Sequence, residues 1–496
     1  MNASYARYLL GVLVLVYVFN FVDRQIPAIL AERIKGDLGA SDAQLGYLYG
    51  TAFAVFYALF GIPLGRLADV WDRRKLIAIG LGFWSLMTAV SGFASTFTQL
   101  AVARVGVGIG EASATPAAFS LISDYFPRQR RASALAIYSS GIYIGIGLGL
   151  FIGGVVAQNW GWRAAFFVVG PPGLLLAAWV ATLREPRRGE SEGLASPAHP
   201  QPWRAFLTEL AAVLPPFTFF HLLRLGASPG ALVSNLAGAA TAAALAWLLS
   251  AALGTPAQWW SLVVGVYAAL SWAQSIVLRD RPAAVLIFGT RSLRLATLGF
   301  ACVSFSGYGL SFWLAPFFAR VHGLPLDRVG LLVGGSAAIG GWLGVMLGGL
   351  LADRWRRTSA TGRLRVGLLN AIVPIPLALA TLWVPDTRLA LALSLPLNVA
   401  AALWLGPGAS TVQDLVLPRM RALASAAYLL AITLISLALG PYLIGRISMA
   451  TGDLRLALSL GFVSNLAAVA CFLWAGRTLE RDEATRLERA RAAGEA

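Results

Sequence analysis

Four ionisable residues lie inside apolar stretches, where charged side chains are unusual: Asp23, Arg24, Arg104 and Glu111. Each such group costs on the order of 3 kcal/mol in the interior of a membrane unless it is paired or hydrated. Arg104 and Glu111 are seven residues apart, which places them on one face of a helix and about 10 Å from each other. Because the four charges sum to zero, we expect a buried cluster whose carboxylates bind and release protons.

A second interpretation of this cluster is structural. The charges would then only fix how the helices pack, helped by the glycines at 106, 108 and 110 that allow close helix approach. We favour proton binding, because carboxylates in a hydrated membrane cavity are the usual holders of a transportable proton. In this hypothesis a nearby arginine keeps a carboxylate ionised, whereas separation from the arginine favours protonation.

A loop sequence, GRLADVWDRRK at 65–75, is partly repeated as GLLADRWRRTS at 349–359. The alignment pairs Gly65 with Gly349, Asp69 with Asp353, and Arg73 with Arg357. PRQR at 127–130 is likewise repeated as PRMR at 418–421. The chain is therefore predicted to contain two copies of one membrane half.

The repeated loop has two interpretations. It is either a solvated turn or a conformational latch, in which an aspartate at a helix end pairs with neighbouring helix ends and releases them when the helices rock. Its repetition favours the latch. The predicted latch residues are Gly65, Asp69, Arg73, Arg74 and Asp353.

The composition is typical of a membrane protein. Hydrophobic residues make up 58% of the 496 residues and charged residues 12%, which is more apolar surface than a soluble core can bury. The net charge of +16 comes from arginine and lysine in alternate loops, a pattern that indicates cytoplasmic loops rather than nucleic-acid binding. Without a Walker-type loop or metal-ligand spacing in the sequence, we expect no cofactor, no metal site and no enzymatic activity.

Apolar runs of about 20 residues predict an all-α polytopic protein with about 14 spans. The first six are expected at 8–30, 43–64, 76–95, 100–122, 132–156 and 164–183, and an inserted hairpin at 231–253 and 258–278. The last six are expected at 295–318, 329–351, 366–384, 389–412, 423–447 and 454–474. The predicted domains are an N-terminal six-helix bundle (1–184), a cytoplasmic linker with an interfacial segment (185–230), the transmembrane hairpin (231–278), a C-terminal six-helix bundle (279–476) and a cytoplasmic tail (477–496).

The distribution of basic residues between loops predicts that both termini are cytoplasmic. The apolar stretch at 206–225 is placed at the membrane interface, because a third crossing there would invert the second half. The hairpin has few charges and surfaces rich in glycine and alanine, so it is expected to pack peripherally against the bundles. Charges at spacings of three and four in the tail predict a solvated helix.

The segment at 65–74 resembles the loop between the second and third helices of major facilitator superfamily transporters: a glycine, three residues, an aspartate and then a basic pair. Val70 and Asp72 depart from that pattern, where the family usually has a basic residue and a glycine. Five further segments resemble the spinster-like branch: NFVDRQ at 20–25, ARVGVGIGEASATP at 103–116, SDYFPRQRRASA at 123–134, NWGWRAAF at 159–166 and SGYGLSFW at 306–313. The resemblance covers nearly the whole chain except about 190–285.

This resemblance implies the major facilitator fold, with two six-helix bundles around a central cavity and alternating access by rocking of the halves. It also implies proton-driven transport of lysolipid-like or sphingoid-phosphate-like molecules, with proton coupling and substrate binding at the four charged residues. Side chains that could line the cavity are Asn20, Tyr138, Tyr308, Trp313 and Asn398.

The predicted function is proton-coupled transport of an amphipathic or anionic organic molecule. Organic-anion symport, multidrug export and a non-transporting receptor or scaffold on the same fold stay open as alternatives. The expected partners are a small-molecule or lipid substrate, protons and membrane lipids, with no nucleic acid. The chain is expected to be a monomer that crosses a plasma membrane, specifically a bacterial-type inner membrane, many times.

Overall fold

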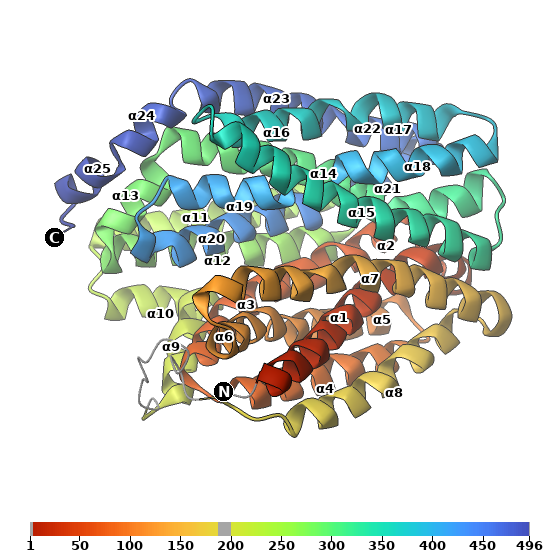
Figure 1. Ribbon diagram of the computed structural model, residues 1–496, viewed down its shortest axis with the longest axis horizontal. Coiled ribbons are helices and arrows are strands. Elements are labelled where there is room, and N and C mark those ends of the chain that lie inside the picture. Colours follow the sequence, from red (N-terminus) through yellow and green to blue (C-terminus); the bar gives the residue numbers. More distant parts are fainter. Residues whose placement is uncertain (1–2, 187–199, 496) are drawn as a thin grey trace. The chain divides into compact units, whose positions relative to one another are not determined.

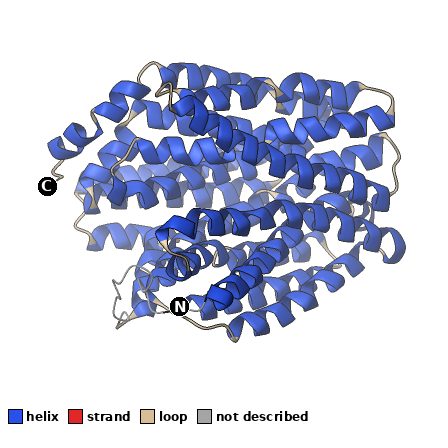
Figure 2. Cartoon of the chain, viewed as in Figure 1, coloured by secondary structure: helices blue, strands red, loops and turns tan. Residues whose placement is uncertain are grey.

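Helices form all of the regular structure in the part of the chain that the computed structural model describes, residues 3–186 and 200–495 (Figure 2). The predicted all-α fold is confirmed. Residues 187–199 of the predicted linker lie outside the described residues.

The helices follow one another along the chain as labelled in Figure 1. The first group is α1 (Ala3–Leu38), α2 (Asp42–Tyr49), α3 (Thr51–Val70), α4 (Arg73–Ser91), α5 (Phe97–Glu111), α6 (Ala114–Tyr125), α7 (Arg128–Trp160) and α8 (Trp162–Ala181). The middle group is α9 (Pro202–Val213), α10 (Phe217–Arg224), α11 (Pro229–Leu253), α12 (Pro256–Arg279) and α13 (Arg281–Gly289).

The second half continues the all-helical pattern. It contains α14 (Arg291–Val321), α15 (Leu326–Arg356), α16 (Gly362–Ile372), α17 (Pro374–Trp383), α18 (Thr387–Ala401), α19 (Leu405–Asp414), η2 (Pro418–Met420) and α20 (Arg421–Ile432). It ends with the π-helical turn η3 (Thr433–Leu437), α21 (Gly440–Thr451), α22 (Leu454–Gly461), α23 (Val463–Gly476), α24 (Leu479–Ala484) and α25 (Arg486–Ala492).

Thirteen helices, some of them joined end to end, are long and apolar enough within the described residues to cross a membrane. They correspond to thirteen of the fourteen predicted spans. The remaining one, 76–95, is α4, a helix of 19 residues whose first turn holds Arg73, Arg74 and Lys75 and which falls short of the required hydropathy. The predicted interfacial stretch forms two short helices, α9 and α10, interrupted at 214–216.

Helix α1 carries two of the candidate residues, and its position is set by close packing against α7. A Cβ atom added at Gly145 or Gly149 would collide with the backbone of α1 at Val18 or Val22. Glycine at these positions therefore allows the two helices to touch backbone to backbone. The glycine-rich run at 141–149 serves helix packing.

Contacts between Cα atoms divide the described chain into two compact units. Unit 1 consists of Met1–Ala40, Phe56–Leu210 and Phe318–Ala338. Unit 2 consists of Ser41–Val55, Ala211–Phe317 and Ile339–Ala496. The units differ from the two sets of six spans, because each unit includes a short segment from the other set.

The tail after α23 is helical and largely exposed, as predicted, but it forms two helices rather than one. It forms α24 and α25, which bury Leu479 and Ala490. Glu483 binds Arg356 at the end of α15, and Asp482 accepts a hydrogen bond of 3.0 Å from the backbone nitrogen of Ser292. The mixed charges of the tail thus bind groups of unit 2 in addition to facing water.

Candidate functional site

The site in unit 1 is built around an ion pair between α1 and α5. Arg24 Nη2 donates to Glu111 Oε2 at 2.9 Å, and the side chain of Glu111 has no exposed surface. The Arg24 guanidinium also lies 4.7 Å from the centre of the Phe21 ring and 5.0 Å from that of Tyr57. Two aromatic faces and one carboxylate therefore hold this cation.

Arg104 of α5 makes a second contact between α5 and α1. It is fully buried, and its Nη1 donates to the backbone oxygen of Asp23 at 3.2 Å. Arg104 and Glu111, seven residues apart on α5, thus contact the consecutive residues Asp23 and Arg24 of α1. The structure brings the four predicted residues together.

The Asp23 carboxyl group differs from the other members of the cluster. It is buried, and Trp84 and Thr88 of α4 lie beside it. Yet neither carboxyl oxygen of Asp23 has a hydrogen-bond partner of normal geometry among the described residues. The same holds for Trp84 Nε1 and for Thr88 Oγ1. A buried carboxyl group in this situation is stabilised by a bound proton, by hydrogen bonds from water or by movement of a nearby cation. The Arg104 guanidinium, which now binds the backbone of the same residue, is that nearby cation.

Glu111 is the last residue of α5, and the chain turns at 112–113 before α6 begins. Gly110, just before it, is packed so tightly that an added Cβ would lie 2.9 Å from Trp84 Cβ. The helix interruption and the glycine therefore fix Glu111 and Trp84 close to each other. Asn20 of α1, a predicted cavity residue, is buried beside Glu111.

The sequence profile of the Major Facilitator Superfamily matches residues 13–441 of this chain. The chain belongs to this superfamily. Its fold and family are therefore those of multi-pass membrane transporters.

Three similar proteins agree with this membership. An MFS-type efflux pump of Mycolicibacterium smegmatis is 30% identical over 482 residues, 95% of this chain and 93% of that protein. Protein spinster of Drosophila melanogaster is 32% identical over 183 residues, 37% of this chain and 30% of that protein. A crystal structure of a bacterial homologue of the human lysosomal transporter Spinster, inward-facing and occupied, has 25% identity and a TM-score of 0.73, and the match covers 97% of this chain and 99% of that chain. The predicted resemblance to spinster-like transporters is confirmed.

The loop motif of this superfamily member forms an ion cluster centred on Arg73. Arg73 is completely buried and binds Asp124 at the end of α6, Glu185 at 2.7 Å and Ser120 Oγ at 2.9 Å. Arg74 binds Asp72 at 3.1 Å. Among the other predicted latch residues, Gly65 is half-buried and Asp69 is exposed.

The second half of the transporter repeats this cluster with another arginine. Arg363 binds Asp414 and the backbone oxygen of Ser410. Arg73 and Arg363 each lie 51 residues before their aspartate. Arg363 is therefore the structural counterpart of Arg73. The alignment with Arg357 was wrong for this position.

Sequence reasoning missed Asp124, Glu185, Asp414 and Arg363. The signal was present, because each aspartate precedes a Pro-Arg pair by a few residues: Asp124 before Pro127 and Asp414 before Pro418. The offset differs by one residue between the two copies, so a rigid alignment of the loops passed over it. Asp353 is exposed at the end of α15.

The remaining predicted cavity residues lie in two environments. Tyr138 is fully buried and stacks on Tyr17 with 4.3 Å between ring centres. Trp313 is also fully buried and donates to Pro441 O at 2.8 Å, so neither side chain lines an open cavity in this structure. Tyr308 and Asn398 are half-buried.

Proposed function

We propose that this chain is a proton-coupled secondary transporter of an amphipathic or anionic organic molecule, of the lysolipid-like or sphingoid-phosphate-like kind, working by alternating access. The observation that carries the proposal is the buried cluster on α1 and α5, in which Arg24 pairs with Glu111 while the Asp23 carboxyl group has no hydrogen bond of normal geometry. A purely structural cluster would satisfy all of its members.

The first step assigned to the cluster is competition for Arg24. An anionic group of the substrate that binds this guanidinium takes the partner of Glu111 away. Glu111, which has no exposed surface, is then stable in the apolar interior only if it carries a proton. Substrate and proton therefore bind together.

The second step is a change of partner at Arg104. Its guanidinium moves from the backbone oxygen of Asp23 to the carboxylate when Asp23 loses its proton. The guanidinium moves only from the backbone to the side chain of the same residue, Asp23. This movement pulls α5 against α1. The rocking of the helices is thereby coupled to protonation.

Alternating access is supported by the segments that each unit receives from the other set of six spans. In unit 1, Arg320 binds Glu32 at 2.6 Å and Leu326 N donates to Gln158 Oε1 at 3.3 Å. In unit 2, Ser448 of α21 donates to Asp42 of α2 at 2.8 Å. These contacts join residues of the two sequence halves at the helix ends away from the arginine-rich loops, called the outer end below. They must break if the halves rock apart.

The proposed topology places both termini, the linker at 185–230 and the arginine-rich loops in the cytoplasm of a bacterial-type inner membrane. Residues 1–184 and 279–476 form the two bundles of one monomer. The clusters around Arg73 and Arg363, with Asp69 and Asp353 at the adjoining helix ends, act as latches on the cytoplasmic side.

Transport in proteoliposomes tests this function. Purified protein is given lysophospholipids, sphingoid phosphates and organic acids, and proton movement is followed with an internal pH dye. We expect one of these classes to cause proton influx that Glu111→Gln abolishes while substrate exchange persists. The matched control Glu480→Gln, an exposed carboxylate in the tail, should behave as the unmodified protein. Substrate flux without any proton movement would contradict the proposal.

A further inference from the structure

The inserted hairpin of α11 and α12 is a rigid pair with a polar seam. Asn235 of α11 is buried and its Nδ2 donates to Ser271 Oγ at 2.9 Å and to Gln274 Oε1 at 2.7 Å. Tyr267 donates to Asn235 Oδ1 at 2.8 Å. A surface rich only in glycine and alanine was expected, and this part of the expectation was wrong. A satisfied polar seam fixes the register of the two helices.

Helix α12 packs against the segment Ser41–Val55, which belongs to the first six spans but lies in unit 2. The amide of Gln258, fully buried, is 2.6 Å from Thr51 Oγ1. A Cβ atom added at Gly265 would lie 2.7 Å from Leu434 Cδ2 and 3.2 Å from Val55 Cγ1, so α12 approaches both side chains closely at this glycine. The hairpin therefore contacts the first half along two turns of helix.

The same face of α12 contacts the second half. Trp259 meets the ring of Tyr442 edge-on, with 5.3 Å between ring centres. Gly265 faces Leu434 of the π-helical turn η3. Turns of this kind are rare and are frequently found at functional sites. Helix α12 thus lies against both α2–α3 and α21, whose contact closes the outer end.

The hydroxyl group of Thr51 connects the hairpin, the first half and the second half. Thr51 Oγ1 lies 2.6 Å from the Gln258 amide and 2.7 Å from the backbone oxygen of Ala438. A hydroxyl group has a single proton, so Thr51 donates to Ala438 and accepts from the amide nitrogen of Gln258 once that amide is turned over. One buried chain of hydrogen bonds then joins the hairpin, the first half and the second half.

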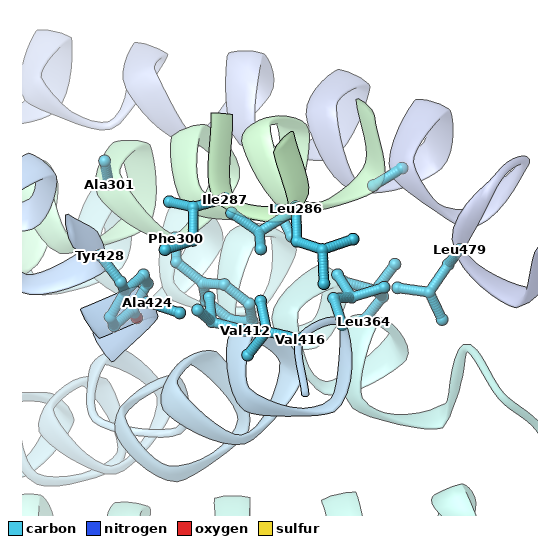
Figure 3. Packing of buried hydrophobic residues seen from close by; sticks show 14 of the residues in the cluster. Leu286, Ile287, Phe300, Ala301, Leu364, Val412, Val416, Ala424, Tyr428 and Leu479 are labelled. Carbon is cyan, nitrogen blue, oxygen red and sulfur yellow. The ribbon is translucent and has the colours of Figure 1, made fainter. Parts of the chain in front are cut away.

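The hairpin is anchored to the second half. Helix α13 follows α12 directly, and its Leu286 and Ile287 are buried in the hydrophobic cluster of the second half with Phe300 and Val412 (Figure 3). Tyr47 Oη also lies 3.5 Å from Ser261 Oγ of α12. When the halves separate, α12 therefore stays with α21, and its contacts with Tyr47, Thr51 and Val55 are the ones that must break.

We propose that the hairpin is a brace for the closed outer end: α12 widens the surface of α21 on which Ser41–Val55 closes, and so stabilises the closed conformation. This goes beyond transport as such, because it assigns a conformational role to the two helices that stand outside both bundles. It rests on the alternating access proposed above.

Accessibility of the closed contact tests the brace without any substrate. Ala43→Cys and Leu45→Cys, two buried positions of α2, serve as separate reporters after replacement of the native Cys302 and Cys471 by alanine. Labelling by a membrane-impermeant maleimide is timed in right-side-out vesicles. Gln258→Leu removes one hydrogen bond and should raise the labelling rate about fivefold, and Gly265→Leu should raise it further. The matched control Gly230→Leu, where an added side chain meets open space, should change nothing.

A cross-link makes the opposite change. Val55→Cys with Gly265→Cys pairs two positions in close contact, because an added Cβ at Gly265 would lie 3.2 Å from Val55 Cγ1. Oxidation to a disulfide should therefore slow reporter labelling, and a reductant should restore it. Unchanged labelling in Gln258→Leu and Gly265→Leu variants that elute as monodisperse protein would overturn the brace. Labelling that responds as expected in a protein without measurable flux would instead leave the brace standing and count against the proposed transport.

Discussion

The two halves of this transporter differ most in what they bury. In the first half, the fully buried groups include Asp23, Arg104 and Glu111, together with Arg73 at the start of α4. In the second half, 279–476, all of which is described, every buried polar side chain is a serine, threonine or asparagine. A duplicated scaffold thus carries ionisable groups in one copy and neutral ones in the other. This asymmetry supports the proposal that proton coupling lies in the first half.

The loop clusters show what the two copies retain. Arg73 and Arg363 each bind an aspartate 51 residues further along, and a glutamate that follows the sixth span of each half lies nearby: Glu185 binds Arg73, and Glu483 binds Arg356 beside Asp414. We infer that the arginine clusters, which both halves have, serve the architecture. The buried charged residues, which only the first half has, are then available for a specific reaction.

The largest expected effect comes from removing a central arginine of the first half. Arg104→Ala removes the cation beside the buried carboxyl group of Asp23, which should lower the free energy of unfolding by about 3 to 5 kcal/mol and abolish both proton-driven transport and exchange. Thermal unfolding in detergent measures it. Arg388→Ala, at an exposed position of α18 in the second half, should be nearly neutral. An equal loss of stability and transport in the two variants would contradict the difference between the halves.

The two loop clusters should respond alike but not equally. The side chain of Arg73 is 1% exposed and that of Arg363 is 17% exposed. Arg73→Ala should therefore lower the free energy of unfolding more than Arg363→Ala does. Each loses hydrogen bonds to charged groups, for which about 2 kcal/mol is typical, with the exposed pair weaker because water screens it. Urea titration of the two variants checks the order. The reverse order would show that the second-half cluster contributes more to the free energy of unfolding.

The sequence was sufficient for the spans and for the four charged residues, because apolar runs and isolated charges within them are local signals. It was not sufficient for Arg363, since the loop alignment pairs Arg73 with Arg357, six residues earlier, and the match with Arg363 is visible only in its contact with Asp414. Gln258 and Thr51 lie 207 residues apart, and neither stands out in an apolar run. Their contact exists only because two distant helices meet, so no periodicity indicates it.

A smaller effect is expected for a neutral polar group of the second half. Ser304 is buried and donates to Phe300 O within α14 at 2.6 Å. Ser304→Ala should lower the free energy of unfolding by about 1 kcal/mol or less and leave the proton-to-substrate ratio unchanged. A changed ratio in the flux assay would place part of the coupling in the second half.

The smallest effect concerns the tail. Hydrogen bonds from Arg419 hold the pKa of Asp280 and of Glu495 below their usual values. Because both pKa values are lowered on folding, the tie stabilises the docked tail above about pH 4 and is lost as the pH falls below that value. The protection of α25 amides against hydrogen exchange, measured relative to the intrinsic exchange rate at each pH, should therefore fall as the pH is lowered below about 4. Glu495→Gln should weaken this pH dependence, and an unchanged profile would show that the tail is held by its apolar contacts alone.

The central claim is that proton coupling lies in the first half, at Asp23 and Glu111. The most direct measurement is substrate accumulation in proteoliposomes that carry a pH gradient and no other driving force, for the double variant Asp23→Asn, Glu111→Gln. These changes keep the shape of both side chains and remove the groups that titrate. We expect accumulation against the gradient to be lost while substrate exchange at equal pH continues. Accumulation at the level of the unmodified protein would contradict the account.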